Sequence, residues 1–104
     1  MSGYFVLEGK MAVEVDSLQR WSRWFFTAER EIARTESSDG AVVKTEFVGV
    51  DQRGATAGEK PLLFETRTFD AGWRSVGRRC YATWTEAEIG HIEEVFHQNG
   101  VLPG

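Results

Sequence analysis

The sequence predicts an α+β fold in which an antiparallel sheet of three to five strands packs against two amphipathic helices. Two β-rich runs, residues 41–50 (AVVKTEFVGV) and 61–69 (PLLFETRTF), are typical of the central pair of such a sheet. Apolar residues recur at helical spacing after residue 17 and again after residue 85. A length of 104 residues is ordinary for one folded unit, so residues 1–104 are expected to form a single α+β domain.

Composition and charge narrow the classes of protein. A hydrophobic fraction of 41% with 12% aromatic residues argues against disorder. The net charge of −4 argues against nucleic acid as a partner, because nucleic-acid-binding proteins normally carry a basic excess. Cys80 is the single cysteine, which excludes an intramolecular disulfide and fits a reducing compartment. No apolar run approaches the ~18 residues of a membrane span, so the expected location is cytoplasmic, with no membrane association.

The N-terminal part is expected to form a hairpin and a helix. Residues 4–15 alternate short β-forming runs about a glycine, which indicates a small hairpin or a bent edge strand. Asp16 and Gln19 have the spacing of a capping box and predict a helix over residues 17–27. Its apolar positions are Leu18, Trp21, Phe25 and Ala28, with Trp24 beside them. Phe26 lies off this stripe and is a candidate for contact with a partner.

Residues 30–36 form a polar run that is typical of an edge strand, although their composition also suits a helix. The following Asp39-Gly40 pair favours positive φ in a tight turn, so a hairpin is predicted between residues 30–36 and 41–50. The second strand turns its odd positions to one face and its even positions to the other. The odd face is expected to meet a helix, and the even face to meet water or a partner. The odd positions are Val43, Thr45 and Phe47, and the even positions are Val42, Lys44, Glu46 and Val48.

The chain then returns to the sheet after a long connection. Residues 51–60 hold two glycines and no apolar run, which indicates a loop, and long loops often carry binding residues. Residues 61–69 form the third strand, opened by Pro61 at a position where a strand tolerates proline. A fourth strand is predicted within residues 76–84, around the run RRCYATW.

The last element is predicted as a helix over residues 86–98. Thr85 and Glu88 have the spacing of a capping box, and the Asn-Gly pair at 99–100 is typical of a helix end. The predicted buried stripe consists of Ile89, Ile92 and Phe96. His91 lies outside this stripe and is expected to border the acidic face of the helix.

Candidates for catalysis or metal binding are few. The pairs His91–Glu94 and Glu93–His97 each place an imidazole and a carboxylate on one helical turn, which suits a metal or a general base. Such pairs are common on acidic helices, so surface or boundary histidines are the favoured interpretation, and neither a metal nor a cofactor is expected. Cys80 follows two arginines, which favour a thiolate, but a buried strand cysteine is the simpler interpretation. Phosphate-loop, G-x-S-x-G and zinc patterns are absent from the sequence, so an enzyme is the less favoured class.

Glu65 is a candidate binding residue because it is the acidic residue inside a strongly β-forming run. An ion pair across the strands with Arg67, Arg34 or Arg30 would hold the register of the sheet and is the favoured interpretation. Alternatively, the carboxylate beside Thr66 and these guanidinium groups could bind a polar ligand on the face of the sheet.

A second candidate site is the basic run of residues 74–79. Arginines and aromatic residues come close together here, a combination that could bind a phosphate and stack on a base. The residues are Arg74, Arg78 and Arg79 with Trp73, Tyr81 and Trp84. The alternative, a solvated strand end with its aromatic residues in the core, is favoured.

The order of motifs over residues 30–94 resembles a family of small uncharacterised bacteriophage and prophage proteins. That family has a V-S-T-V-x-L-G-x-D strand, a P-x-x-F-E-T-M-x-F strand and an R-Y-x-T-x-x-E-A-x-x-G-H helix start. The matching residues are Thr45, Gly49 and Asp51 in the first motif, Pro61, Phe64, Glu65, Thr66 and Phe69 in the second, and Tyr81, Thr83, Glu86, Ala87, Gly90 and His91 in the third. Lys44, Arg67 and Cys80 depart from the family pattern.

The resemblance implies an accessory protein that acts in the cytoplasm of a bacterial host. The first expectation is a non-enzymatic protein that binds a host protein, for example to inhibit a host enzyme or defence factor. Self-association as a homodimer, through an edge strand or the aromatic helix, is expected with it. The alternative is a binder of a small anionic ligand such as a nucleotide signal, and an enzyme built on His91 and Glu65 comes third.

Overall fold

The described part of the chain runs as two strands, a helix, four strands and a second helix. The computed structural model describes residues 3–51 and 60–98. The elements are β1 (Tyr4–Glu8), β2 (Met11–Val15), α1 (Leu18–Thr27), β3 (Glu31–Glu36), β4 (Val42–Phe47), β5 (Phe64–Phe69), β6 (Ser75–Tyr81) and α2 (Trp84–Gln98). They form a two-stranded and a four-stranded antiparallel sheet with two helices, which confirms the predicted fold class. Residues 52–59, most of the predicted loop at 51–60, lie outside the described residues. The predicted helix end at 99–100 also lies outside them.

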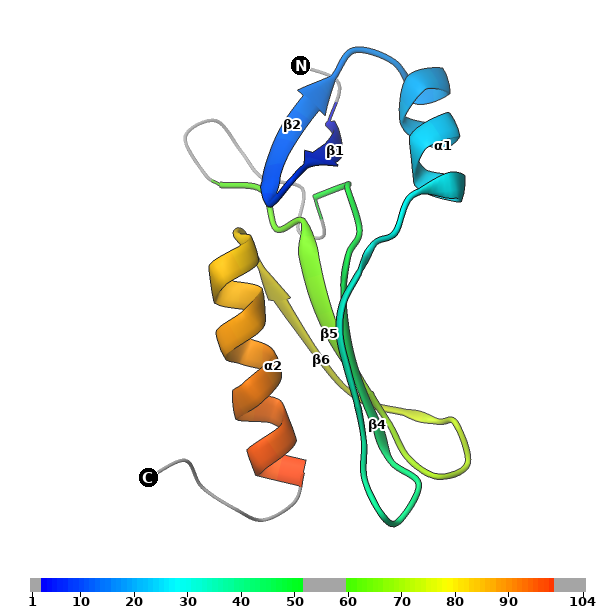
Figure 1. Cartoon of the computed structure of the whole chain (residues 1–104), viewed down its shortest axis with the longest axis vertical. Coiled ribbons are helices and arrows are strands. Elements are labelled where there is room, and N and C mark those ends of the chain that lie inside the picture. The colour runs from blue at the N-terminus through cyan, green and yellow to red at the C-terminus, as the bar shows by residue number, and fades with distance from the viewer. Residues whose placement is uncertain (1–2, 52–59, 99–104) are drawn as a thin grey trace.

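The four-stranded sheet has the order β3-β4-β5-β6, so each strand is hydrogen-bonded to its neighbour in sequence. β4 and β5 are the central pair, as predicted, and their register places Thr45 opposite Thr66. Gly40, in the turn between β3 and β4, has a positive φ of 90°, as the Asp-Gly pair predicts. The long, slightly twisted sheet with its two hairpin turns at the lower end can be followed in Figure 1.

α2 packs along one face of this sheet (Figure 1). Its buried residues are Ala87, Gly90 and His91. A Cβ at Gly90 would lie 2.2–2.3 Å from the ring and hydroxyl of Tyr81, so the helix can approach this closely only where a glycine stands. The predicted buried stripe is therefore wrong: Ile89 and Ile92 are each 53% exposed, and Phe96 is half-buried.

Both helices are capped by a residue within two positions of the predicted one. Ser17, rather than Asp16, caps α1, because its Oγ accepts the N–H of the third residue on at 3.2 Å. α2 begins at Trp84, and the Oγ1 of Thr83 accepts the Glu86 N–H at 3.2 Å. The capping box of α2 therefore starts two residues earlier than predicted.

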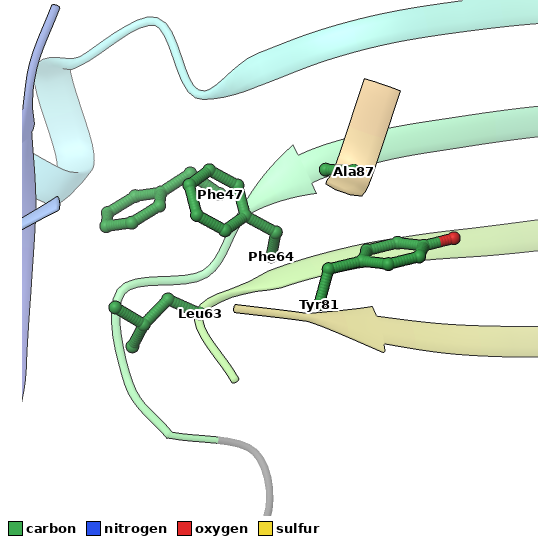
Figure 2. Packing of buried hydrophobic residues seen from close by; sticks show 5 residues of the cluster. All are labelled: Phe47, Leu63, Phe64, Tyr81 and Ala87. Carbon is green, nitrogen blue, oxygen red and sulfur yellow. The ribbon is translucent and has the colours of Figure 1, made fainter. Parts of the chain in front are cut away.

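The β1–β2 hairpin and α1 close the upper end of the sheet in Figure 1. The Phe5 N–H donates to the Gly49 carbonyl oxygen at 2.8 Å, which joins the hairpin to the chain that leaves β4. Trp24 of α1 packs edge-on against Phe47, with ring centroids 5.6 Å apart. The buried core lies between this end and α2, and Figure 2 shows the rings of Phe47 and Phe64 together near Leu63. Its buried members are Phe47, Leu63, Phe64, Tyr81 and Ala87.

Candidate binding face of the sheet

Two neighbouring residues of β5 show how the two faces of the sheet differ. Successive residues of a strand point to opposite faces, and Thr66 bonds to the Tyr81 hydroxyl in the layer beneath α2, at 3.1 Å. Glu65 therefore points to the other face. His91 belongs to the α2 side, so His91 and Glu65 do not converge. An enzyme built on both residues, the third expectation, would require them to meet in one cleft, and they lie on opposite faces of the sheet.

A network of hydroxyl groups around one imidazole is buried between the sheet and α2. His91 is only 5% exposed, and its Nε2 and Nδ1 bond to the hydroxyls of Thr35 and Thr45 at 2.9 and 2.8 Å. The Thr45 hydroxyl bonds to that of Thr66 at 2.5 Å, and the Tyr81 hydroxyl also donates to Thr66. His91 was expected at the border of the acidic face, and this expectation is wrong. The imidazole instead fastens α2 to β3 and β4.

Burial lowers the pKa of His91 below its ordinary value. A histidine with a lower pKa in the folded state binds fewer protons when folded than when unfolded. The stability that depends on the neutral ring is therefore fully present above the unfolded pKa of about 6.5 and is lost as the pH falls below it.

We expect the native protein to lose more unfolding free energy between about pH 7.5 and about pH 5.5 than a His91→Gln variant does. Glutamine can still hydrogen-bond to the threonine hydroxyls but does not titrate. Urea unfolding at the two pH values measures the difference. His97→Gln, at the exposed end of the same helix, should follow the native protein. Equal losses in all three proteins would contradict the assignment to His91.

Glu65 lies near the centre of the face opposite α2, with a side chain only 9% exposed. Its Oε1 contacts the Nε of Arg67 at 3.1 Å and the Nε of Arg78 at 3.4 Å, and both arginine side chains are nearly half exposed. The predicted pairing of Glu65 with Arg67 is confirmed, although it runs along one strand, and the partner across the strands is Arg78. One buried carboxylate thus holds two guanidinium groups in place, leaving one net positive charge.

A second carboxylate with two cations lies directly beside the first. Glu46 stands opposite Glu65 in the register of β4 and β5, and it contacts the Nζ of Lys44 at 3.4 Å and the Nη1 of Arg30 at 3.9 Å. Four cations around two carboxylates give a net charge of +2. Glu31 lies opposite Glu46 on the edge strand, so the positive excess is greatest on the β5–β6 side. The charged face, as we call it, consists of Arg30, Lys44, Glu46, Glu65, Arg67 and Arg78.

Two aromatic rings border the charged face. The rings of Phe69 and Trp73 lie 5.6 Å apart at the end of the sheet where β5 turns into β6. The guanidinium of Arg67 lies 5.7 Å from the Phe69 ring, and that of Arg34 lies 5.9 Å from the Trp73 ring. Trp73 is 61% exposed and has a positive φ of 62°, which is uncommon for a non-glycine residue. An exposed apolar contact is therefore available next to the cations.

The three arginines of the predicted basic cluster do not come together. Arg78 belongs to the charged face, as described above. Arg79, one residue on, points to the α2 side and contacts Glu93 at 3.1 Å. Arg74 pairs with Asp70 in the turn, at 2.9 Å. The sequence places these arginines close together, but strand alternation and the turn separate them.

The remaining predicted site residues lie away from the charged face. Tyr81 is 8% exposed in the core, and the Trp84 ring lies 6.4 Å from that of Phe64. Phe26, on α1 beyond the upper end of the sheet, is 83% exposed. Cys80, by contrast, stands opposite Glu65 in the register of β5 and β6, on the same side of the sheet as the charged face. Burial raises the pKa of its thiol, which favours the structural interpretation of this cysteine over a reactive thiolate.

Sequence reasoning does not single out Lys44 and Glu46 as site residues. Their even positions in residues 41–50 predict a face open to water or a partner, and the charged face agrees with that expectation. Their meeting with Glu65 depends on the register between two strands that are 16 or more residues apart in the chain. Spacing in the sequence carries no signal for that register.

Comparison with known proteins adds no relative. A scan against models of protein families found no match, and searches of curated proteins and of solved structures also found none. The resemblance to bacteriophage proteins therefore stays a prediction. No helix within residues 3–51 and 60–98 is both long enough and apolar enough to cross a membrane. The same residues contain no group of three or more His, Cys, Asp or Glu side chains placed to hold a metal ion.

Proposed function

We propose that the protein is a non-enzymatic binding protein that recognises an acidic segment of a partner protein on the charged face. The observation that best supports this function is that the buried Glu65 carboxylate forms ion pairs with both Arg67 and Arg78. A guanidinium that is already fixed in place loses less side-chain entropy on binding a carboxylate than a free one does. The two groups are therefore prepared for an anionic partner.

The distribution of the cations favours a protein segment over a small ligand. Lys44, Arg67 and Arg78 lie on three consecutive strands, β4, β5 and β6. Neighbouring strands are about 4.8 Å apart, so these charges extend over roughly 10 Å across the sheet. A single phosphate cannot reach all of them, whereas an acidic peptide can. The exposed ring of Trp73 beside them offers such a peptide an apolar contact.

Electrostatics support the same partner class. The whole chain carries a net charge of −4, yet the six residues of the charged face sum to +2, and the sum stays positive at +1 when Glu31, Arg34 and Glu36 of the adjoining edge strand are added. A local positive surface on an acidic protein orients an acidic partner during approach and weakens other encounters. The resemblance to bacteriophage proteins supports a host protein as the source of the acidic segment, in a bacterial cytoplasm.

We expect a fluorescein-labelled poly-glutamate peptide to bind the native protein. Arg67→Gln and Arg78→Gln should each weaken the binding about tenfold, because each substitution removes one charge-assisted hydrogen bond to the peptide. Each variant leaves Glu65 paired with the other arginine, so the fold is kept. Fluorescence anisotropy measures the dissociation constants. The affinity should also fall when salt is raised from about 50 mM to about 300 mM.

Arg20→Gln is the matched control, because Arg20 is an exposed arginine on α1 that also pairs with a carboxylate, that of Asp16. It should leave peptide binding unchanged. Equal weakening in Arg20→Gln and Arg78→Gln would mean that net charge, rather than the charged face, controls binding. Capture of a protein from a bacterial lysate should show the same order of variants.

The small-ligand alternative is favoured by one observation, the pairing of two guanidinium groups at Glu65. Thermal-shift measurements with nucleotides at millimolar concentration separate the two functions. Nucleotide binding would become the favoured function if a nucleotide raised the melting temperature of the native protein but not of Arg78→Gln, and if the acidic peptide did not bind.

A further inference from the structure

The outer side of α2 carries an apolar stripe in which two isoleucines are exposed. Ile89 and Ile92 are each 53% exposed, and Phe96 is half-buried. A helix turns by 100° per residue, so these three residues lie within about 60° of arc and stand opposite the buried side of the helix. We call them the outer stripe: Ile89, Ile92 and Phe96.

The packing of α2 on the sheet explains why the outer stripe points away. The inner side of the helix needs a glycine at position 90, because any Cβ there would overlap the Tyr81 ring. The neutral ring of His91 is held by hydroxyls on β3 and β4. These contacts fix the rotation of α2 about its axis. In Figure 1 the opposite side of α2 is turned away from every labelled element.

Helix formation does not account for isoleucine at two exposed positions. Isoleucine is a weaker helix former than Leu, Glu, Lys, Gln or Ala, so an exposed helix position that only had to be helical would favour one of those. Apolar residues at i, i+3 and i+7 on an exposed side are instead typical of a surface that packs against another helix.

We infer that the outer stripe is a self-association surface on which α2 of one copy packs antiparallel against α2 of a second copy. Two polar side chains near the ends of the helix favour this arrangement. The first turn contains Glu86 and the last turn contains His97, both on the same flank of the stripe. An antiparallel pair with its two-fold axis at Ile92 brings Glu86 of each copy beside His97 of the other, and it also opposes the two helix dipoles.

The other acidic residues beside the stripe are compatible with this pairing. Glu93 is paired within its own chain with Arg79, at 3.1 Å, and the same guanidinium lies 3.9 Å from Glu94. Glu88 of one copy would stand about 12 Å along the axis from Glu88 of the other, from eight residues at about 1.5 Å each. In a parallel pair Glu86 of each copy would instead stand about 16 Å along the axis from His97 of the other, from eleven residues at about 1.5 Å each. The antiparallel arrangement is therefore the one that the charges select.

Sedimentation velocity tests the self-association over about 1 µM to about 200 µM, because one pair of helices buries less surface than a standard interface and should give a weak dimer. The 11.7 kDa chain is expected to double its mass at the upper end of this range. Ile92→Lys should stay monomeric throughout. Leu18→Lys is the matched control, since Leu18 on α1 is 54% exposed, and it should dimerise like the native protein.

Disulfide trapping tests the antiparallel arrangement. In a Cys80→Ser background, Ile92→Cys places two thiols at the two-fold axis, and oxidised glutathione should link them into a covalent dimer by thiol–disulfide exchange. Glu88→Cys should link far more slowly, because its two thiols are too far apart for a disulfide. Equal linking at the two positions would overturn the antiparallel pairing.

Two sedimentation outcomes would overturn the self-association. The first is a native protein that is monomeric over the whole range, and the second is a dimer that Ile92→Lys leaves intact. If the native protein is monomeric, a lower melting temperature in Ile92→Lys would mean that residues of the same chain cover the outer stripe. None of these outcomes bears on the charged face, which is tested by the acidic peptide.

Discussion

Gly90→Ala is expected to destabilise the protein by about 3 kcal/mol, although alanine is the better helix former. In an exposed helix this substitution would stabilise by up to about 1 kcal/mol. Here the new methyl group would lie 2.2 Å from the hydroxyl and 2.3 Å from ring carbons of Tyr81. The Tyr81 ring is buried in the core and cannot move aside freely. Urea unfolding should show the lower free energy of unfolding. Thermal unfolding should show a melting temperature lower by about 15 °C.

A double-mutant cycle identifies the clash as the cause. Shortening Tyr81 to valine removes the ring that the new methyl group meets, so Gly90→Ala should cost much less in that background than in the native protein. Gly77→Ala is the control on the neighbouring strand, because a Cβ there meets its nearest atoms at an ordinary 3.6 Å. If Gly90→Ala costs the same with and without the Tyr81 ring, the close approach of α2 to β6 is not what requires glycine.

This close approach also explains why the sequence predicts the helix but not its buried side. Capping residues and helical spacing mark α2 correctly within two residues of its start. Apolar periodicity then selects Ile89, Ile92 and Phe96, because it assumes that the apolar side is the buried one. The observed inner side carries two small residues and one polar residue, His91. Hydrogen bonds from the His91 ring to hydroxyls on β3 and β4 stabilise its burial. Those partners are 46 and 56 residues away from His91.

The candidate site was predictable to the extent that it depends on neighbours along one strand. Glu65 and Arg67 are two residues apart, so strand alternation alone puts them on the same face. Arg78 joins them through the register of β5 and β6, which the sequence does not specify. The same alternation sends Arg79 to the opposite face. Arginines that are adjacent in a strand are therefore divided between its two faces. Of Arg78 and Arg79, only Arg78 belongs to the charged face.

Gly49→Ala is expected to destabilise the protein by about 3 kcal/mol, for two reasons that add. Gly49 has a positive φ of 73°, which costs alanine about 1 kcal/mol or more. A Cβ there would also lie 2.6 Å from the Nε1 of Trp21 and 2.8 Å from the carbonyl oxygen of Phe5. The second of these is a backbone atom of β1, so the hairpin itself would have to shift.

Gly9→Ala separates the two contributions. Gly9 has a similar positive φ of 62°, but a Cβ at that position has no atom within 4 Å. It should cost only the backbone part, about 1 kcal/mol, and urea unfolding of both variants gives the difference. Since the β1–β2 hairpin and α1 meet the sheet at Gly49, a large excess in Gly49→Ala would show that the hairpin is held against the sheet by close packing. Equal costs in the two variants would mean that the hairpin moves aside without loss, and that its attachment contributes little to the fold.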